Sequence, residues 1–420
     1  MGGGRGPCSS KEKEDPVSDF EGEFSGLGGG AGEAHGSHGG EEGTLVRPAW
    51  SRTAAAAAGH SVSGGSPSPH AEVVMGVASG GAWDRVVTGS DDGTCALVEW
   101  GTGAVVRRWR GHTKGVTAVS SGRARDGEEG AAGVVASASR DGTVRLWGEG
   151  SDEAAGVLEA HELTATAVAL SPPGGGTGLL CATGGRDARV TVWDVGRRER
   201  TQAVKMPLNM VTGLCWCPET EGLLAQSGED VVSPVRLWDT RRGLGPGAVE
   251  VLKGYKDFPK CIDVSGCGTY VLTGSNGFQG SGCEVWVWDR RSARAPLSVM
   301  RGHTEAVLCC TFARGSSAGA RAGALTGMGG TAGGLVAVTG SKDGSVRVWD
   351  VDACATLCVL DNGLRGPAQS LACLGSKDDA EGARLALGSF DGSVHVFELG
   401  RVVSSDGVIP DMRCVLDAQV

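Results

Sequence analysis

Histidine and cysteine side chains are the groups in this sequence that could most readily act as bases, nucleophiles or metal ligands. The chain contains 8 His and 14 Cys among 420 residues. Most of the cysteines lie in strand-like apolar runs, as Cys181, Cys261, Cys309 and Cys310 do, and no C-x-x-C pair occurs. Such positions are typical of buried, reduced thiols. We therefore expect no metal site.

Many of the remaining polar residues belong to a short unit that predicts two strands joined by a tight turn. The clearest copy is Gly334 to Asp350, in which an apolar run precedes Lys342-Asp343-Gly344 and valines then alternate with Arg347 and Trp349. An aspartate in such a turn bonds nearby backbone, and glycine adopts a positive φ without steric cost. Alternation after the turn is typical of a half-buried strand.

Seven copies of this unit follow one another, each closed by an aromatic residue. These residues are Trp100, Trp147, Trp193, Trp238, Trp288, Trp349 and Phe397. Their separation of about 45 to 60 residues is typical of β-propeller blades with loop insertions. A Gly-His or Ala-His pair precedes three copies, ending in His112, His161 and His303.

The order Gly-His, Asp turn, Trp-Asp, repeated over about residues 70 to 400, resembles the WD-repeat family. The resemblance implies an all-β fold: a single seven-bladed WD-repeat β-propeller over residues 70–420, with a disordered N-terminal tail. It also implies that four residues of a blade form a buried hydrogen-bonded network. The implied sets are His112, Ser137, Asp141 and Trp147; His161, Thr183, Asp187 and Trp193; and His303, Thr339, Asp343 and Trp349.

The other histidines and the glycine-rich stretches do not indicate catalysis. His70 opens the first blade as an equivalent of His112, and no remaining histidine forms an obvious base–nucleophile pair. There is no G-x-x-x-x-G-K-[ST] motif, and the glycines at 274–282 open no helix that could bind phosphate. We expect a non-enzyme without a cofactor.

Residues 1–69 read as a disordered leader and linker rich in Gly, Glu, Ser and Ala. Residues 1–43 carry −6 of the net charge of −10, and no basic stripe elsewhere indicates nucleic-acid binding. No apolar run is long enough for a membrane span, and no secretory signal is present. Acylation of Gly2 and Cys8 would give weak membrane association, although Gly6 stands where myristoylation favours Ser or Thr.

Two stretches could supply the outer strand of the last blade. The C-terminal stretch from Met412 to Val420 is the favoured one, and a return of Thr44 to Trp50 is the alternative. Closure matters because an open ring leaves strand edges that pair with other chains. We expect a monomer outside its complexes.

Protein partners are expected at the propeller rim and at the face where the turns emerge. The residue before each turn aspartate should point to that face, which makes Arg140, Arg186, Lys342 and Phe390 candidates. Mixed charge with an exposed aromatic suits a protein ligand, although solvated turn residues would look the same.

Two finer resemblances give competing functions. Trp238-Asp239-Thr240-Arg241 and Trp288-Asp289-Arg290-Arg291 resemble the docking motif of substrate receptors for cullin-4 ubiquitin ligases, with Arg241 and Arg291 as contacts. The atypical stretches Asn209 to Trp216 and Ser275 to Glu284 resemble a ciliary group of WD-repeat proteins. The favoured expectation is a cytoplasmic or ciliary scaffold that regulates intraflagellar transport and recruits trafficking complexes.

Overall fold

The structure is a computed structural model. It describes residues 70–418 except for 81–84, 124–132, 173–177, 207–209, 219, 231, 246–249, 293, 314–334, 361–365, 375–382 and 405–406. The leader 1–69, with Gly2 and Cys8, lies outside the described residues. Of the described residues, none is in a helix long and apolar enough to cross a bilayer.

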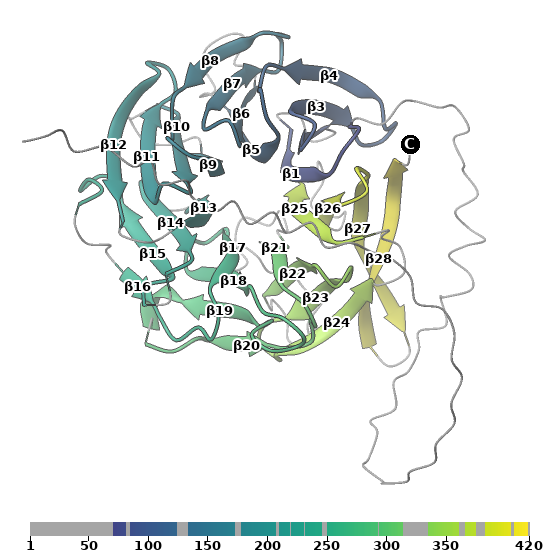
Figure 1. The fold of residues 1–420 in the computed structure, drawn as a ribbon. Helices are drawn as coiled ribbons and strands as arrows, with labels where there is room; N and C mark the ends of the chain where they lie inside the picture. Colours follow the sequence, from purple (N-terminus) through teal and green to yellow (C-terminus); the bar gives the residue numbers. More distant parts are fainter. Residues whose placement is uncertain are drawn as a thin grey trace, which may run out of the picture. The chain divides into compact units, whose positions relative to one another are not determined.

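The described residues form seven four-stranded antiparallel sheets, each with its strands in chain order (Figure 1). Blades one to four comprise β1 (Val74–Ser79), β2 (Arg85–Ser90), β3 (Thr94–Glu99), β4 (Val105–Arg110); β5 (Val116–Arg123), β6 (Gly133–Ser139), β7 (Val144–Gly148), β8 (Ala154–Leu158); β9 (Ala165–Leu170), β10 (Leu180–Gly185), β11 (Arg189–Asp194), β12 (Glu199–Lys205); β13 (Val211–Trp216), β14 (Leu223–Gly228), β15 (Val235–Asp239), β16 (Glu250–Leu252).

Blades five to seven comprise β17 (Pro259–Val264), β18 (Tyr270–Ser275), β19 (Val285–Asp289), β20 (Ser298–Met300); β21 (Val307–Phe312), β22 (Val336–Ser341), β23 (Val346–Asp350), β24 (Ala355–Leu360); β25 (Ala368–Leu374), β26 (Ala383–Ser389), β27 (Val394–Ser404), β28 (Gly407–Ala418). A single 3₁₀ turn, η2 (Arg290–Ser292), follows β19. The first strand of each blade contacts the first strand of the next, and β25 returns to β1. The expected all-β, seven-bladed propeller is confirmed.

In each blade a turn joins the second strand to the third, and the two strands pair antiparallel. In blade six, β22 and β23 pair antiparallel, with Ala337 opposite Trp349 and Gly340 opposite Val346. Gly344 closes this turn at a φ of +79°, in the left-handed region that glycine adopts most easily. Because antiparallel strands alternate direction, these turns and the loops entering each blade lie at one end of the ring.

The core lies between neighbouring sheets rather than within one of them. Val338 and Val348 of blade six, for example, share a buried cluster with Leu385 and Phe397 of blade seven. A blade therefore cannot bury its apolar faces alone, and its stability depends on the two blades beside it.

The C-terminal stretch supplies the outer strand of blade seven. β28 pairs with β27 and begins at Gly407, five residues before the expected Met412. Thr44 to Trp50 lies outside the described residues. Blade seven joins blade one through side chains, as Val74, Val77 and Val86 share a buried cluster with Val394 and Val396.

Trp100 is not the closing aromatic of blade one, so that part of the sequence interpretation is wrong. Val98 lies opposite Val86, in the place that Trp147 takes opposite Val135. Trp100 follows the end of β3, and its ring lies 4.6 Å from the Arg384 guanidinium of blade seven. Trp100 is the nearest tryptophan in sequence, but it lies two residues beyond Val98, which occupies the position in register.

The Arg384–Trp100 contact predicts a measurable contribution to closure of the ring. A cation–π pair with a largely buried guanidinium stabilises by about 1–2 kcal/mol, and Arg384 is 7% exposed. Urea unfolding of Trp100→Leu, Arg384→Met and the double variant should give a coupling of this size. Strictly additive losses would show that the contact does not stabilise closure.

Candidate functional site

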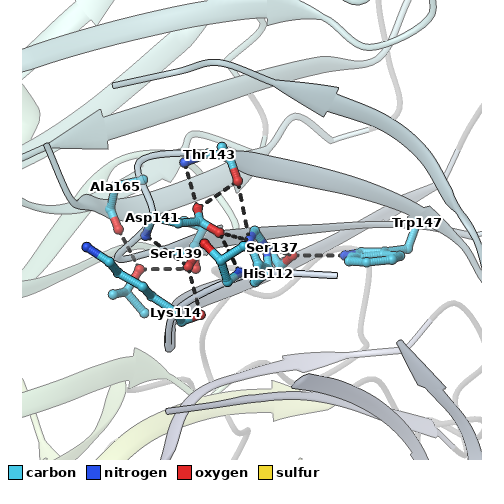
Figure 2. A network of polar contacts seen from close by, with 11 residues as sticks. His112, Lys114, Ser137, Ser139, Asp141, Thr143, Trp147 and Ala165 are labelled. Carbon is cyan, nitrogen blue, oxygen red and sulfur yellow. Dashed lines mark hydrogen bonds and ion pairs between the residues drawn. The ribbon is translucent and has the colours of Figure 1, made fainter. Parts of the chain in front are cut away.

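The polar residues of blade two converge beneath the turn between β6 and β7 (Figure 2). His112 comes from the loop entering the blade, Ser137 from β6, Asp141 from the turn and Trp147 from β7. His112 Nδ1 lies 3.0 Å from an Asp141 oxygen, and its Nε2 lies 2.8 Å from Ser137 Oγ. The Trp147 indole N–H donates to the same Ser137 oxygen at 2.9 Å. Two strands, one loop and one turn are thereby held together.

These contacts form a continuous chain of donors and acceptors with a neutral histidine. The indole N–H donates to Ser137 Oγ, the Ser137 hydroxyl donates to His112 Nε2, and His112 Nδ1–H donates to Asp141. Burial lowers the pKa of His112, which favours the neutral form. Burial alone would raise the pKa of Asp141, but hydrogen bonds from Thr143, Thr113 and His112 hold it well below its usual range.

Blades three and six repeat the arrangement. His161 lies 2.9 Å from Asp187 and 3.1 Å from Thr183, to which Trp193 donates at 3.2 Å. In blade six the corresponding distances are 3.0 Å for His303 to Asp343, 2.8 Å for His303 to Thr339 and 2.8 Å for Trp349 to Thr339. Burial also lowers the pKa of His161 and His303.

Two further hydroxyls belong to the networks of blades two and six, and sequence reasoning missed them. The Ser139 hydroxyl donates to the Lys114 carbonyl and accepts from the Asp141 N–H, while the Thr143 hydroxyl donates to Asp141. Ser341 and Ser345 do the same in blade six. The signal was present as Ser-x-Asp-Gly-Ser/Thr, which recurs in four blades.

Blades one and five use different residues for the same purpose. In blade one His70 lies 2.7 Å from Thr88, as expected of a His112 equivalent, although no tryptophan completes the set. In blade five the Tyr255 hydroxyl takes the place of the imidazole, 2.9 Å from Thr273, and accepts from Trp288 at 2.7 Å.

Blades four and seven depart further from the pattern. In blade four Trp238 donates to the Gln226 side-chain oxygen at 2.9 Å. In blade seven His395 comes from the third strand and bonds Ser393 at 2.7 Å.

The networks hold their polar groups away from solvent. Ser137, Thr183 and Thr339 are each fully buried, and each hydroxyl already accepts from an indole. A substrate cannot reach these oxygens without unfolding the blade. Among the residues that the structure describes, no group of three or more His, Cys, Asp or Glu is placed to hold a metal ion.

An equivalent turn residue occurs in every blade: it precedes the turn aspartate in six blades and is Asn276, before Gly277, in blade five. Its backbone N–H donates to the carbonyl just before the first strand of the same blade, at 2.9–3.1 Å. We name this set the turn ring: Asp91, Arg140, Arg186, Glu229, Asn276, Lys342 and Phe390. Arg140, Arg186, Lys342 and Phe390 are exposed. The Arg140 guanidinium lies 3.2 Å from Asp91, so one member contacts the neighbouring blade.

Arg241 and Arg291 lie at the opposite end of the strands, after β15 and β19. Each guanidinium is bound by the aspartate two residues before it, with Nε at 2.9 Å from Asp239 and at 3.0 Å from Asp289. Both arginine side chains remain largely exposed, at 60% and 69%. The two Trp-Asp-x-Arg segments thus present equivalent cations on consecutive blades.

Replacing one network histidine tests its structural role. His161→Ala should lower the free energy of unfolding by about 1–3 kcal/mol, because Asp187 and Thr183 lose a buried partner. Glu162→Ala is the matched control, since its exposed ion pair with Arg189 contributes little. Thermal unfolding measures both variants, and equal melting midpoints would contradict the network in blade three.

The lowered histidine pKa values predict loss of stability on mild acidification. The unfolded chain takes up protons near pH 6.5 whereas the buried imidazoles resist them, so the free energy of unfolding is constant above that range and falls below it. Asp141 and Asp343, whose pKa values are also lowered, add a further loss below about pH 4. Urea midpoints from pH 8 to pH 5 should decrease, with a shallower slope for His161→Gln; a rise would contradict neutral histidines.

Comparison with known proteins supports the repeat assignment. The family model described as WD domain, G-beta repeat, matches residues 103–148 and 294–350, which include the complete networks of blades two and six. Nuclear distribution protein PAC1 of Arthroderma otae is 26% identical over 206 residues, covering 48% of this chain and 43% of that protein. Nuclear distribution protein nudF of Aspergillus niger is 24% identical over 303 residues, covering 71% of this chain and 54% of that protein.

A shorter match has higher identity. PAC1 of Fusarium vanettenii is 32% identical over 119 residues, covering 27% of this chain and 25% of that protein. The chain therefore spans 54% or less of the length of these relatives. The protein is thus a seven-bladed β-propeller in which residues 103–148 and 294–350 match the model of the WD domain, G-beta repeat.

Proposed function

We propose that this propeller is a non-catalytic scaffold that binds other proteins through the face bearing the turn ring. The observation that carries the proposal is the ring itself. Seven equivalent backbone positions are held by the same hydrogen bond, yet their side chains differ in charge, size and polarity. A rigid frame with varied exposed side chains suits recognition of another surface.

The turn ring favours a protein ligand over a nucleic acid. Arg140, Arg186 and Lys342 are accompanied by Asp91 and Glu229, so the ring is of mixed charge. Phe390 adds an aromatic side chain that is 52% exposed. A nucleic-acid surface would be expected to carry a continuous basic stripe instead.

For the cellular process, we propose ciliary trafficking, with the protein acting in the cytoplasm or at the cilium. The support is the resemblance of Asn209 to Trp216 and Ser275 to Glu284 to WD repeat-containing protein 31. These stretches lie where the general repeat pattern is not followed, so they discriminate within the family. The relatives matched above are named for nuclear distribution, which makes placement of nuclei a second process to examine.

The alternative function is recruitment of substrates to a cullin-4 type ubiquitin ligase. The observation that favours it is the equivalent exposure of Arg241 and Arg291 on consecutive blades. This surface lies at the opposite end of the strands from the turn ring, so both functions could operate in one molecule. Acylation of Gly2 and Cys8 stays a prediction that would add membrane association.

Affinity capture from ciliated cells separates these functions. Wild-type chain should recover intraflagellar transport components, and a variant with Arg140→Glu, Arg186→Glu and Lys342→Glu should lose them because the charges at the turn ring are reversed. Arg241→Ala with Arg291→Ala should leave that recovery intact. Mass spectrometry measures the proteins recovered by each form. If the wild-type chain recovers the ligase adaptor and only the Arg241→Ala, Arg291→Ala variant loses it, the alternative function is favoured. Equal recovery of every protein by all forms would refute binding at either surface.

A further inference from the structure

Blade five carries a longer turn than its neighbours, and this turn forms a small hairpin. Residues 276–284 join β18 to β19, where residues 342–345 suffice in blade six. Phe278 N–H donates to the Ser281 carbonyl at 2.9 Å, and Ser281 N–H donates back at 3.0 Å. Gln279 and Gly280 between them have φ values of 50° and 75°. Two successive positive φ values are typical of a tight two-residue hairpin, so Phe278 is fixed at its base.

The hairpin is held on both sides. Gly280 N–H donates to the Thr304 carbonyl of blade six at 2.7 Å, and Lys256 Nζ donates to Ser281 Oγ at 2.8 Å. Gly277 has no room for a side chain, because an added Cβ would lie 2.1 Å from the backbone of Gly282. Nevertheless Phe278 is 61% exposed. A solvent-exposed aromatic ring on an ordered turn is typical of a residue that contacts a partner protein.

The most exposed charged groups around this hairpin are cations. Lys256 and Lys342 are exposed, and within the described part of the chain neither lies within ion-pair distance of a carboxylate. Arg301 is 74% exposed beside Glu284. Thr304 connects this surface to the turn of blade six, since its N–H donates to Asp343 at 3.0 Å.

The nearby carboxylates are mostly engaged. Asp343 belongs to the blade-six network, Asp257 accepts the N–H of Phe258 at 2.8 Å, and Glu284 is only 12% exposed. Glu305 is half-buried. Because these carboxylates are less exposed than Lys256, Lys342 and Arg301, the surface favours an incoming negative charge.

We propose, building on the protein-binding role above, that this surface of blades five and six binds an acidic peptide segment. An aliphatic or aromatic side chain of the peptide packs on Phe278, and its carboxylates bind Lys256 and Lys342. The apolar contact supplies affinity, and the charges select acidic over basic sequences.

Fluorescence anisotropy with the full chain tests this inference. The probe is a fluorescein-labelled peptide, Gly-Glu-Glu-Leu-Trp-Glu-Glu-Leu-Gly, with a matched peptide in which lysine replaces every glutamate. The acidic peptide should bind about tenfold more tightly than the basic one at low salt. Phe278→Ala should weaken binding about tenfold, with an unchanged melting midpoint because the ring is exposed. Lys256→Gln retains an N–H donor for Ser281 and should remove much of the salt dependence.

Leu297→Ala is the matched control, since it removes an exposed apolar side chain from the opposite end of blade five, in the connection between β19 and β20. It should leave the affinity unchanged. If Phe390→Ala weakens binding and Phe278→Ala does not, the assignment to blade five is overturned while binding at the turn face stands. Equal affinity for the acidic and basic peptides would overturn the acidic-peptide inference. Preference for a labelled oligo(dT), abolished by Phe278→Ala, would also overturn it. In either case the scaffold proposal is tested separately by the capture experiment.

Discussion

A buried indole N–H beneath the turn needs an acceptor in five of the seven blades, and much of the blade architecture follows from how that need is met. Ser137, Thr183 and Thr339 accept from the tryptophan on the next strand. Where the hydroxyl or the histidine is replaced, another acceptor takes over, as Gln226 and the Tyr255 hydroxyl do. In blade seven the aromatic is Phe397, which has no N–H, and the equivalent position on β26 is the apolar Leu387. Every one of these indoles keeps an acceptor because an unpaired buried group is costly.

Satisfying these groups also determines what the surface can do. The imidazoles, hydroxyls and carboxylates that might otherwise catalyse a reaction are turned inward and bonded to one another. The side chains left outside, at the turn ring and around Phe278, differ in charge and size between blades. Recognition by varied exposed residues on a rigid frame is the role that this division favours.

Ring closure follows a different principle from blade formation. No strand is shared between the N-terminal and C-terminal ends of the described residues, because β25 to β28 complete blade seven from consecutive chain. The join with blade one relies on packed valines and on the Arg384–Trp100 contact. Side-chain packing can replace a shared strand where both neighbouring faces are apolar enough to exclude water.

The sequence by itself determined the blade number and the strand–turn–strand unit. It also determined which histidine, hydroxyl, aspartate and tryptophan residues meet in blades two, three and six. These follow from local turn chemistry and period-two alternation, which repeat visibly along the chain. It misplaced Trp100, started the last strand late and overlooked Ser139 and Thr143. Only the tertiary structure decided that Val98 takes the tryptophan position, that Tyr255 replaces a histidine and that Phe278 stands exposed beside Lys256. Each of these depends on strand register or on contacts between blades distant in sequence, and a residue's type does not reveal which neighbour it will meet.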